Sequence, residues 1–171
     1  AYVIYRSKKT LSLPALTVGS IIPDLDTIFH YLTRGDAGRE LLHSFFGAGV
    51  LGTLLSTLLT VSFYPLVVSA FLGISKEEIR QVCRLSKTVL VSAFLGGLSH
   101  VLIDSTCHNY NPLFYPFTKQ SIDILLLTYD WRLSYTIVET LLFAVLLITL
   151  IIDLSKKGTQ GFWKRILVGW D

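Results

Sequence analysis

The sequence has little of what stabilises a soluble or disulfide-bonded domain. Only 16% of its 171 residues are charged, against about 25% in soluble domains, which disfavours a soluble globular protein. Cys83 and Cys107 are too few for a disulfide framework and match no zinc-ribbon spacing, so we expect both to be small buried residues. The net charge of +3 forms no basic stripe, so we expect no nucleic-acid partner.

Apolar residues, 51% of the chain, are concentrated in four blocks at residues 11–32, 44–74, 88–103 and 133–152. A bilayer core about 30 Å thick needs about 20 helical residues. The second and fourth blocks are therefore long enough to cross unaided, and the first and third are shorter before they meet charge. Pro65 predicts a kink in the second block. We predict an all-α polytopic membrane bundle of about four to five helices over residues 1–155, followed by a basic and aromatic interfacial tail over residues 156–171.

The basic residues predict the orientation of the bundle. The connections between blocks alternate between rich and poor in lysine and arginine, and the rich connections are expected in the cytoplasm. The rich ones contain Arg6, Lys8, Lys9, Lys76, Arg80, Arg84, Lys87, Lys156, Lys157, Lys164 and Arg165. Segments 24–43 and 104–132 should then face the outer side. The opening AYVIY followed by RSKK resembles the end of an apolar helix, so we expect further sequence upstream.

Ionisable residues gather at the predicted outer ends of the blocks. At about 1.5 Å per helical residue, Asp24 and His100 lie at a similar height, roughly 20 Å above the cytoplasmic charges. His100, Asp104 and His108 are spaced i, i+4, i+8, which places them along one helical face if the helix continues that far. Ionisable groups within a membrane are costly and usually functional.

Two simpler interpretations remain open for these residues. The histidines could form a polar stripe hydrogen-bonded to neighbouring helices, and Pro-Asp could be an ordinary turn or helix cap. A cap explains one aspartate but leaves Asp26 beside the apolar segment IFHYL, where a cation would neutralise it. His30 is expected to be structural or to support the ligands. Glu139, in the last block, either pairs structurally or completes the ligand set.

We therefore predict a site for one or two divalent ions, with zinc preferred and manganese or magnesium as alternatives. The predicted ligands are Asp24, Asp26, His43, His100, Asp104 and His108.

Three motifs, in order, resemble the membrane-bound metal-dependent hydrolases, including the LexA-regulated inner-membrane hydrolases of bacteria. They are GSIIPDLD, RELLHSFFG and GGLSHVLIDSTCHNYNPLFYPF, and the resemblance covers residues 12–118. It implies a metal-dependent hydrolase related to zinc-dependent phospholipase C and P1-type nucleases. The positions that match the family pattern are Asp24, Asp26, Arg39, His43, Ser44, His100 and Asp104, with His108 matching some members.

The chain departs from this pattern at two places. Gly38 precedes Arg39, where members often have a histidine, and nothing before His30 matches a histidine that many members have near the N-terminus.

The expected function is metal-dependent hydrolysis of a phosphoester in a lipid-like substrate, at the extracytoplasmic face of the cell membrane. A metal would activate water and polarise the phosphoryl oxygen. Asp24, Asp26 or Asp104 could act as the general base, and Arg39 could either pair with an anionic oxygen or be an ordinary surface charge. The expected partners are membrane lipids and this substrate. The alternatives are a non-catalytic scaffold whose metal ties helices together and, with less support, an ion or proton transporter.

Overall fold

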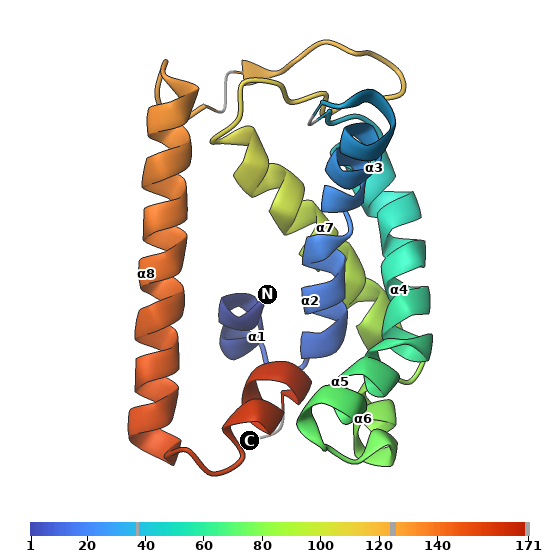
Figure 1. The fold of residues 1–171 in the computed structure, drawn as a ribbon, viewed down its shortest axis with the longest axis vertical. Helices are drawn as coiled ribbons and strands as arrows, with labels where there is room; N and C mark the ends of the chain where they lie inside the picture. The colour runs from blue at the N-terminus through green and yellow to red at the C-terminus, as the bar shows by residue number, and fades with distance from the viewer. Residues whose placement is uncertain (37, 124–125, 170–171) are drawn as a thin grey trace.

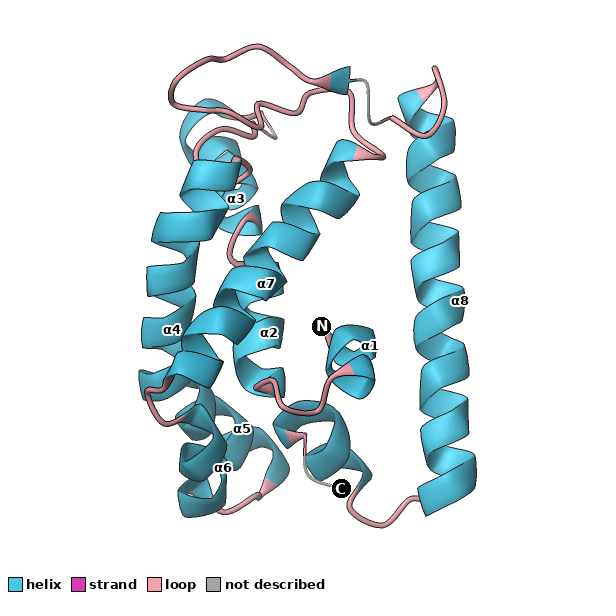
Figure 2. Cartoon of the chain, turned by 180° about the vertical axis from the view of Figure 1, so that it is seen from behind, coloured by secondary structure: helices cyan, strands magenta, loops and turns pink. Residues whose placement is uncertain are grey.

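The computed structural model describes residues 1–36, 38–123 and 126–169, and within these ranges the protein is helical with no strand (Figures 1 and 2). The predicted all-α membrane bundle is confirmed. Its elements are α1 (Tyr2–Ser7), α2 (Leu13–Ile21), α3 (Asp24–Arg34), the π-helical segment η1 (Gly47–Gly52), α4 (Thr53–Ser62), α5 (Tyr64–Leu72), α6 (Lys76–Cys83), α7 (Lys87–Ser105), α8 (Trp131–Lys157) and the π-helical segment η3 (Lys164–Val168).

Proline divides the first two apolar blocks into shorter helices. In the first block, α2 ends at Ile21 and α3 begins at Asp24, directly after Pro23. In the second block, α4 and α5 meet at an angle of 47° around Phe63, two residues before Pro65. Proline lacks the N–H that would bond the carbonyl four residues earlier. The predicted kink is thus confirmed, and the break at Pro23 places Asp24 in the first turn of α3.

Among the described residues, α7 and α8 are long and apolar enough to cross a membrane, and the bent pair Gly47–Ser62 with Tyr64–Leu72 could form a third span. The third block is thus longer than expected, because α7 continues through Asp104 to Ser105. The 27 residues of α8 extend about 40 Å. Only 6% of its most apolar window is buried within the protein, so most of its surface is available to lipid. Figure 1 shows α8 beside the bundle formed by the other helices.

Glycines allow α2 and α7 to pack closely. A Cβ atom added at Gly19 would lie 2.3 Å from the carbonyl oxygen of Ala93, and one at Gly96 would lie 2.5 Å from that of Leu16. Such small residues let helix backbones approach closely in membrane bundles. The contact fixes the register of α7 on α2, so that His100, one turn beyond Gly96, lies beside the C-terminal end of α2.

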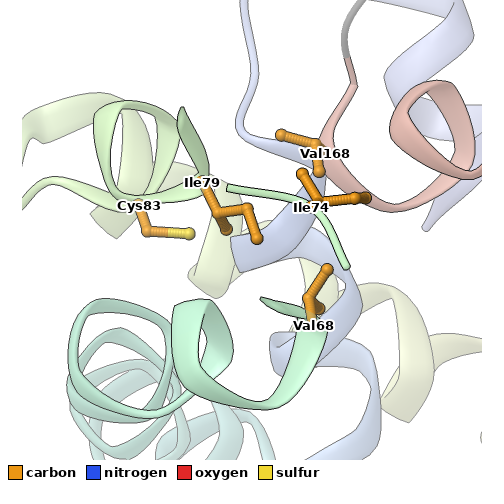
Figure 3. Packing of buried hydrophobic residues seen from close by; sticks show 5 residues of the cluster. All are labelled: Val68, Ile74, Ile79, Cys83 and Val168. Carbon is orange, nitrogen blue, oxygen red and sulfur yellow. The ribbon is translucent and has the colours of Figure 1, made fainter. Parts of the chain in front are cut away.

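The C-terminal segment packs back onto the bundle. Val168 of η3 is buried with residues of α5, α6 and their connection, namely Val68, Ile74, Ile79 and Cys83 (Figure 3). Asp153 of α8 is fully buried, with one oxygen 2.8 Å from Nε of Arg165 and the other 3.2 Å from Nη1 of Arg6. The predicted boundary at residue 156 falls inside α8, and residues 170 and 171 of the predicted tail lie outside the described residues. The interfacial position of the tail stays a prediction. The predicted burial of both cysteines is confirmed.

The two ends of the bundle differ in their charged residues, which makes the orientation testable. Figure 1 shows α3 and the α7–α8 connection at one end, and α5, α6 and η3 at the other. We expect α6 in the cytoplasm and α3 outside, because the α6 region is rich in basic residues.

After the native cysteines are replaced, an impermeant thiol reagent applied to intact cells should label Asp36→Cys and leave Arg80→Cys unlabelled. Both positions are exposed, so lysed cells should label both. Labelling of position 80 alone in intact cells would reverse the orientation.

Candidate metal centre

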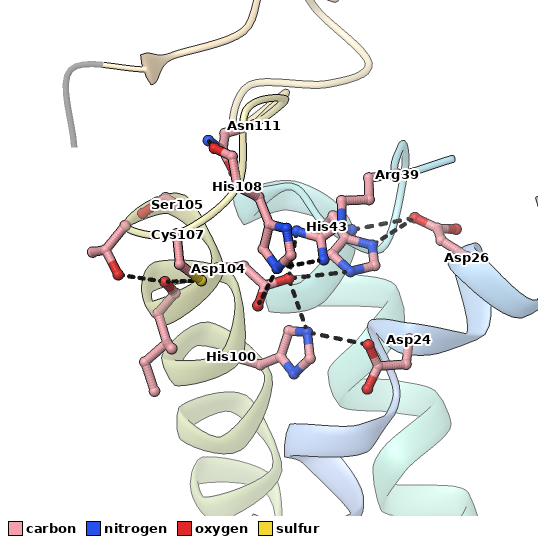
Figure 4. Close-up of polar contacts among 12 residues, drawn as sticks. Asp24, Asp26, Arg39, His43, His100, Asp104, Ser105, Cys107, His108 and Asn111 are labelled. Carbon is pink, nitrogen blue, oxygen red and sulfur yellow. Dashed lines mark hydrogen bonds and ion pairs between the residues drawn. The ribbon is translucent and has the colours of Figure 1, made fainter. Parts of the chain in front are cut away.

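Three segments that are distant in the sequence bring carboxylates and imidazoles together at one end of the bundle (Figure 4). Asp24 lies in the first turn of α3, His43 in the turn before η1, and His100 on the last turns of α7. One ligand atom from each of these three residues lies within 4.8 Å of the others. We call Asp24, His43 and His100 the first ligand group.

His100 makes the hydrogen bond that typically orients a metal-binding histidine. Its Nδ1 lies 2.8 Å from the carbonyl oxygen of Ser20, and a carbonyl can only accept, so Nδ1 carries the proton. Nε2 faces the site, 3.5 Å from Oδ1 of Asp24 and 3.3 Å from Oδ2 of Asp104, and in the neutral imidazole it is the nitrogen that carries the lone pair. Metal-binding histidines usually donate their second ring nitrogen to such a partner.

His43 is 3% exposed, and neither of its ring nitrogens has a hydrogen-bond partner among the described residues. Nε2 of His100 is also buried without one, and Oδ2 of Asp104 is buried with an ion pair to Arg39 at 2.9 Å as its contact to a cation. Nε2 of His43 lies 3.5 Å from that Asp104 oxygen. Buried polar atoms are nearly always hydrogen-bonded, and exceptions call for an explanation such as an ion. A divalent ion would satisfy these converging atoms, and imidazole with carboxylate is a donor set that zinc and manganese accept.

Asp26 holds the loop that carries Arg39 and His43. Its Oδ2 accepts the backbone N–H groups of Glu40, Leu42 and His43 at 3.3, 2.5 and 3.2 Å. Burial alone would raise the pKa of Asp26, but the His43 ring, whose Nδ1 lies 3.5 Å from Oδ2, and the N–H of Leu42 hold it below its ordinary value. Because Oδ2 is engaged in this way, the predicted role of Asp26 as a ligand rests on its other oxygen.

Ser44 forms the turn that follows His43. Its hydroxyl donates to the carbonyl of Leu41 at 2.7 Å and accepts the N–H of Gly47 at 2.9 Å. A Cβ atom at Gly47 would lie only 1.6 Å from the Leu41 carbonyl oxygen, so this turn requires glycine. Ser44 therefore positions His43 at the start of the second apolar block.

Asp104, Cys107 and His108 form a second ligand group among the described residues, their ligand atoms also within 4.8 Å of one another. The expected continuous helical face stops at Ser105, where α7 ends. A turn then keeps His108 nearby, because its N–H donates to the Asp104 carbonyl at 3.0 Å. Arg39 lies against this group, with Nη1 2.9 Å from Oδ2 of Asp104 and Nη2 2.8 Å from Nε2 of His108.

The second ligand group is a weak metal site, because Arg39 occupies the lone pair of His108 and the thiol of Cys107 keeps its proton. Burial, followed by the Arg39 guanidinium, lowers the pKa of His108 to about 4, so its imidazole is neutral and accepts from Arg39. Burial raises the pKa of Cys107 to about 11, and its thiol lies 3.4 Å from the carbonyl of Ile103. A protonated thiol is a weak ligand, because thiolate is the form that binds metals.

Two cavities adjoin the cluster, and His108 lines both. The first, about 620 Å³, lies over α3 and the start of α8 and is lined by Arg34, Arg39, Glu40 and Trp131, among others. The second, about 480 Å³, lies between α1, α7 and α8 and is lined by His100, Asp104, Tyr135 and Glu139 together with apolar residues. Glu139 thus faces a cavity next to the cluster but belongs to neither ligand group of the described residues.

His30 has the structural surroundings expected of it. It is 4% exposed, and its ring nitrogens lie 3.5 Å from Asp36 and 3.7 Å from Glu40. A Cβ atom at Gly38 would meet the His30 ring at 2.2 Å. The ring therefore packs against the backbone of the loop that carries Arg39.

The YdjM inner membrane protein family matches residues 1–167. The chain belongs to this family. No curated protein and no solved structure matches it. Membership confirms a membrane protein of an inner-membrane family, and the family description names no activity.

The structure of this YdjM-family chain assigns two residues to the site that were not expected there from the sequence. Cys107 belongs to the second ligand group, and its position three residues after Asp104 was a usable signal. Ser20 orients His100 through its backbone carbonyl. Any residue type supplies that group, so the sequence holds no signal for it.

Proposed function

We propose that this YdjM-family protein is a membrane-embedded, metal-dependent hydrolase that acts on phosphoester bonds of a lipid-like substrate. The main support is the convergence of the buried ring nitrogens of His43 and His100, which have no full set of hydrogen-bond partners among the described residues, with the carboxylates of Asp24 and Asp104. Two imidazoles and one carboxylate are a ligand set of catalytic zinc sites, which keep one coordination position open.

A divalent ion bound there would polarise a phosphoryl oxygen and provide a water molecule ionisable near neutral pH. Asp24 is the most accessible of the three proposed bases, with 51% of its side chain exposed. Oδ2 of Asp26 is engaged by backbone N–H groups, and Asp104 is paired with Arg39. We therefore favour Asp24, through the carboxylate oxygen that would not bind the ion, as the group that accepts a proton from the attacking water.

Arg39 supplies the anion-binding group. It lines the 620 Å³ cavity, and a guanidinium has five N–H donors, so those not used by Asp104 and His108 can donate to a phosphoryl oxygen. The 480 Å³ cavity has apolar walls that include Val138, Leu142 and Val145 of α8. A polar cavity and an apolar one on either side of His108 favour an amphiphilic substrate. From the charge bias, we propose that the site faces the extracytoplasmic side.

The transporter alternative has less support. A relay across the membrane needs ionisable or polar groups along the whole path. Residues 88–99 of α7 contain no ionisable side chain, and the described cluster lies at one end of that helix (Figure 4).

The test is a panel of phosphodiesters and phosphomonoesters offered to the protein in nanodiscs with zinc, manganese or magnesium. We expect turnover that a chelator removes and that His100→Ala lacks. At one equivalent of metal, Arg39→Ala should raise the activation free energy by about 2–5 kcal/mol, because a buried charge contact is lost. Arg34→Ala is the matched control: Arg34 lines the same cavity but pairs with Glu40 instead of Asp104, so most activity should remain.

Two results would contradict the proposal. If no substrate turns over above the His100→Ala background and ion flux appears in liposomes, the transporter interpretation replaces it. If both assays are silent although the metal is bound, the metal serves as a structural link in a scaffold.

A further inference from the structure

Asp104 belongs to the second ligand group and also contacts the first. Its Oδ2 lies 3.3 Å from Nε2 of His100 and 3.5 Å from Nε2 of His43, while its Oδ1 lies 4.0 Å from Nε2 of His108. A carboxylate placed in this way would bridge two metal ions, as in two-metal hydrolytic sites. The positions of the ligand atoms alone would therefore allow a second ion.

A protein cation is already present at the second ligand group. The Arg39 guanidinium contacts both Asp104 Oδ2, at 2.9 Å, and His108 Nε2, at 2.8 Å. The hydrogen bond uses the lone pair of His108 that an ion would need. Figure 4 shows the Arg39 side chain extending toward His108 and Asp104.

Arg39 cannot easily release these contacts. A guanidinium keeps its positive charge at any pH a protein meets, and only 17% of this side chain is exposed. The loop that carries it is held by three backbone hydrogen bonds to Asp26. An ion bound to His108 would have to displace a fixed like charge from a mostly buried site.

We infer that Arg39 takes the place of a second metal ion, so that the centre binds one divalent ion at the first ligand group. The inference rests on the proposed metal centre and adds its stoichiometry. In a two-ion site, one ion activates water and the other neutralises charge on the substrate anion. Here the residues of the first ligand group would hold the ion that activates water, and the guanidinium of Arg39 would neutralise the substrate anion.

The experiment counts ions per chain and does not depend on activity. The full chain in detergent is stripped of metal, titrated with zinc by calorimetry, and analysed for bound zinc after gel filtration. The wild type should bind one ion. Arg39→Gln and Arg39→Leu should bind two, because both remove the charge and free His108. Arg39→Lys, which keeps the charge, should bind one.

Two further variants assign the additional ion to its ligands. Arg39→Gln combined with His108→Ala should return to one ion, because the second ligand group loses its imidazole. Arg34→Leu, which removes an arginine of the same cavity that contacts neither Asp104 nor His108, should stay at one. A monodisperse elution profile serves as the folding criterion for every variant, and Arg39→Gln alone suffices if Arg39→Leu fails it.

The results separate this inference from the proposed centre. Two ions in the wild type, or one ion in a folded Arg39→Gln variant, would overturn the role of Arg39 and leave the metal centre standing. No zinc in the wild type would overturn the metal centre and with it the inference.

Discussion

Replacing His100 with alanine is expected to remove the metal-dependent part of the protein's thermal stability. Ligands of the first group come from α3, the turn before η1, and α7, so an ion bound there joins three segments. An ion at a thousandfold excess over its dissociation constant stabilises the folded state by about 4 kcal/mol. For a chain of this size, that corresponds to roughly 8–16 °C in melting temperature. Melting curves with zinc and with a chelator should therefore differ for the wild type and coincide for His100→Ala.

His30→Ala is the matched control for this measurement. His30 is also a buried histidine, but it contacts Asp36 and Glu40 and belongs to neither ligand group of the described residues. The variant can melt at a lower temperature in both conditions, yet its zinc-dependent difference should match that of the wild type. A His100→Ala protein that zinc still stabilises as much as the wild type would show that His100 is not a ligand.

Replacing Asp26 with alanine is expected to destabilise the protein by about 3–5 kcal/mol. Three backbone N–H groups lose their common acceptor, and each buried donor left without a partner costs about 1–3 kcal/mol, part of which water recovers. Because the same loop carries His43 and Arg39, zinc affinity should fall as well. Melting curves in the presence of chelator measure the first effect without the second.

Asp36→Ala provides the comparison for Asp26. Asp36 lies in the same loop, is exposed, and accepts one hydrogen bond, from the N–H of Gly38 at 3.0 Å. Its removal should change the free energy of unfolding by about 0.5 kcal/mol, as for most surface substitutions. Equal melting temperatures for the two variants would mean that the hydrogen bonds to Asp26 do not hold the loop. Asp26→Asn should fall between them, since one acceptor oxygen remains.

The sequence predicted the membrane bundle and the assembly of the cluster because both follow from one-dimensional patterns. Apolar blocks of helical length predict a bundle of membrane helices. The alternation of connections rich and poor in lysine and arginine indicates which block ends lie on the same side of the membrane. That was enough to place Asp24, His43 and His100 together, since His43 and His100 lie near the outer ends of their blocks and Asp24 lies at a similar height above the cytoplasmic charges. The kink near Pro65 likewise follows from the chemistry of one residue.

The functions of Asp26 and Arg39 were harder to predict because their partners are set by tertiary structure. Asp26 accepts from backbone N–H groups 14 to 17 residues later, and every non-proline residue carries such a group. Arg39 reaches His108, 69 positions away, from a loop whose path the sequence pattern does not specify. The helical spacing of His108 also failed to continue, because α7 ends at Ser105 and a turn carries the histidine instead.

X-ray absorption at the zinc edge of the zinc-loaded protein tests the central claim most directly. We expect one zinc per chain with a first shell of nitrogen and oxygen atoms at about 2.0–2.2 Å and the outer-shell scattering of two imidazoles. His100→Ala protein should show no specifically bound zinc. Sulfur scattering at about 2.3 Å would place the ion on Cys107 or Cys83 instead, and a wild-type protein that retains no zinc would contradict the metal centre itself.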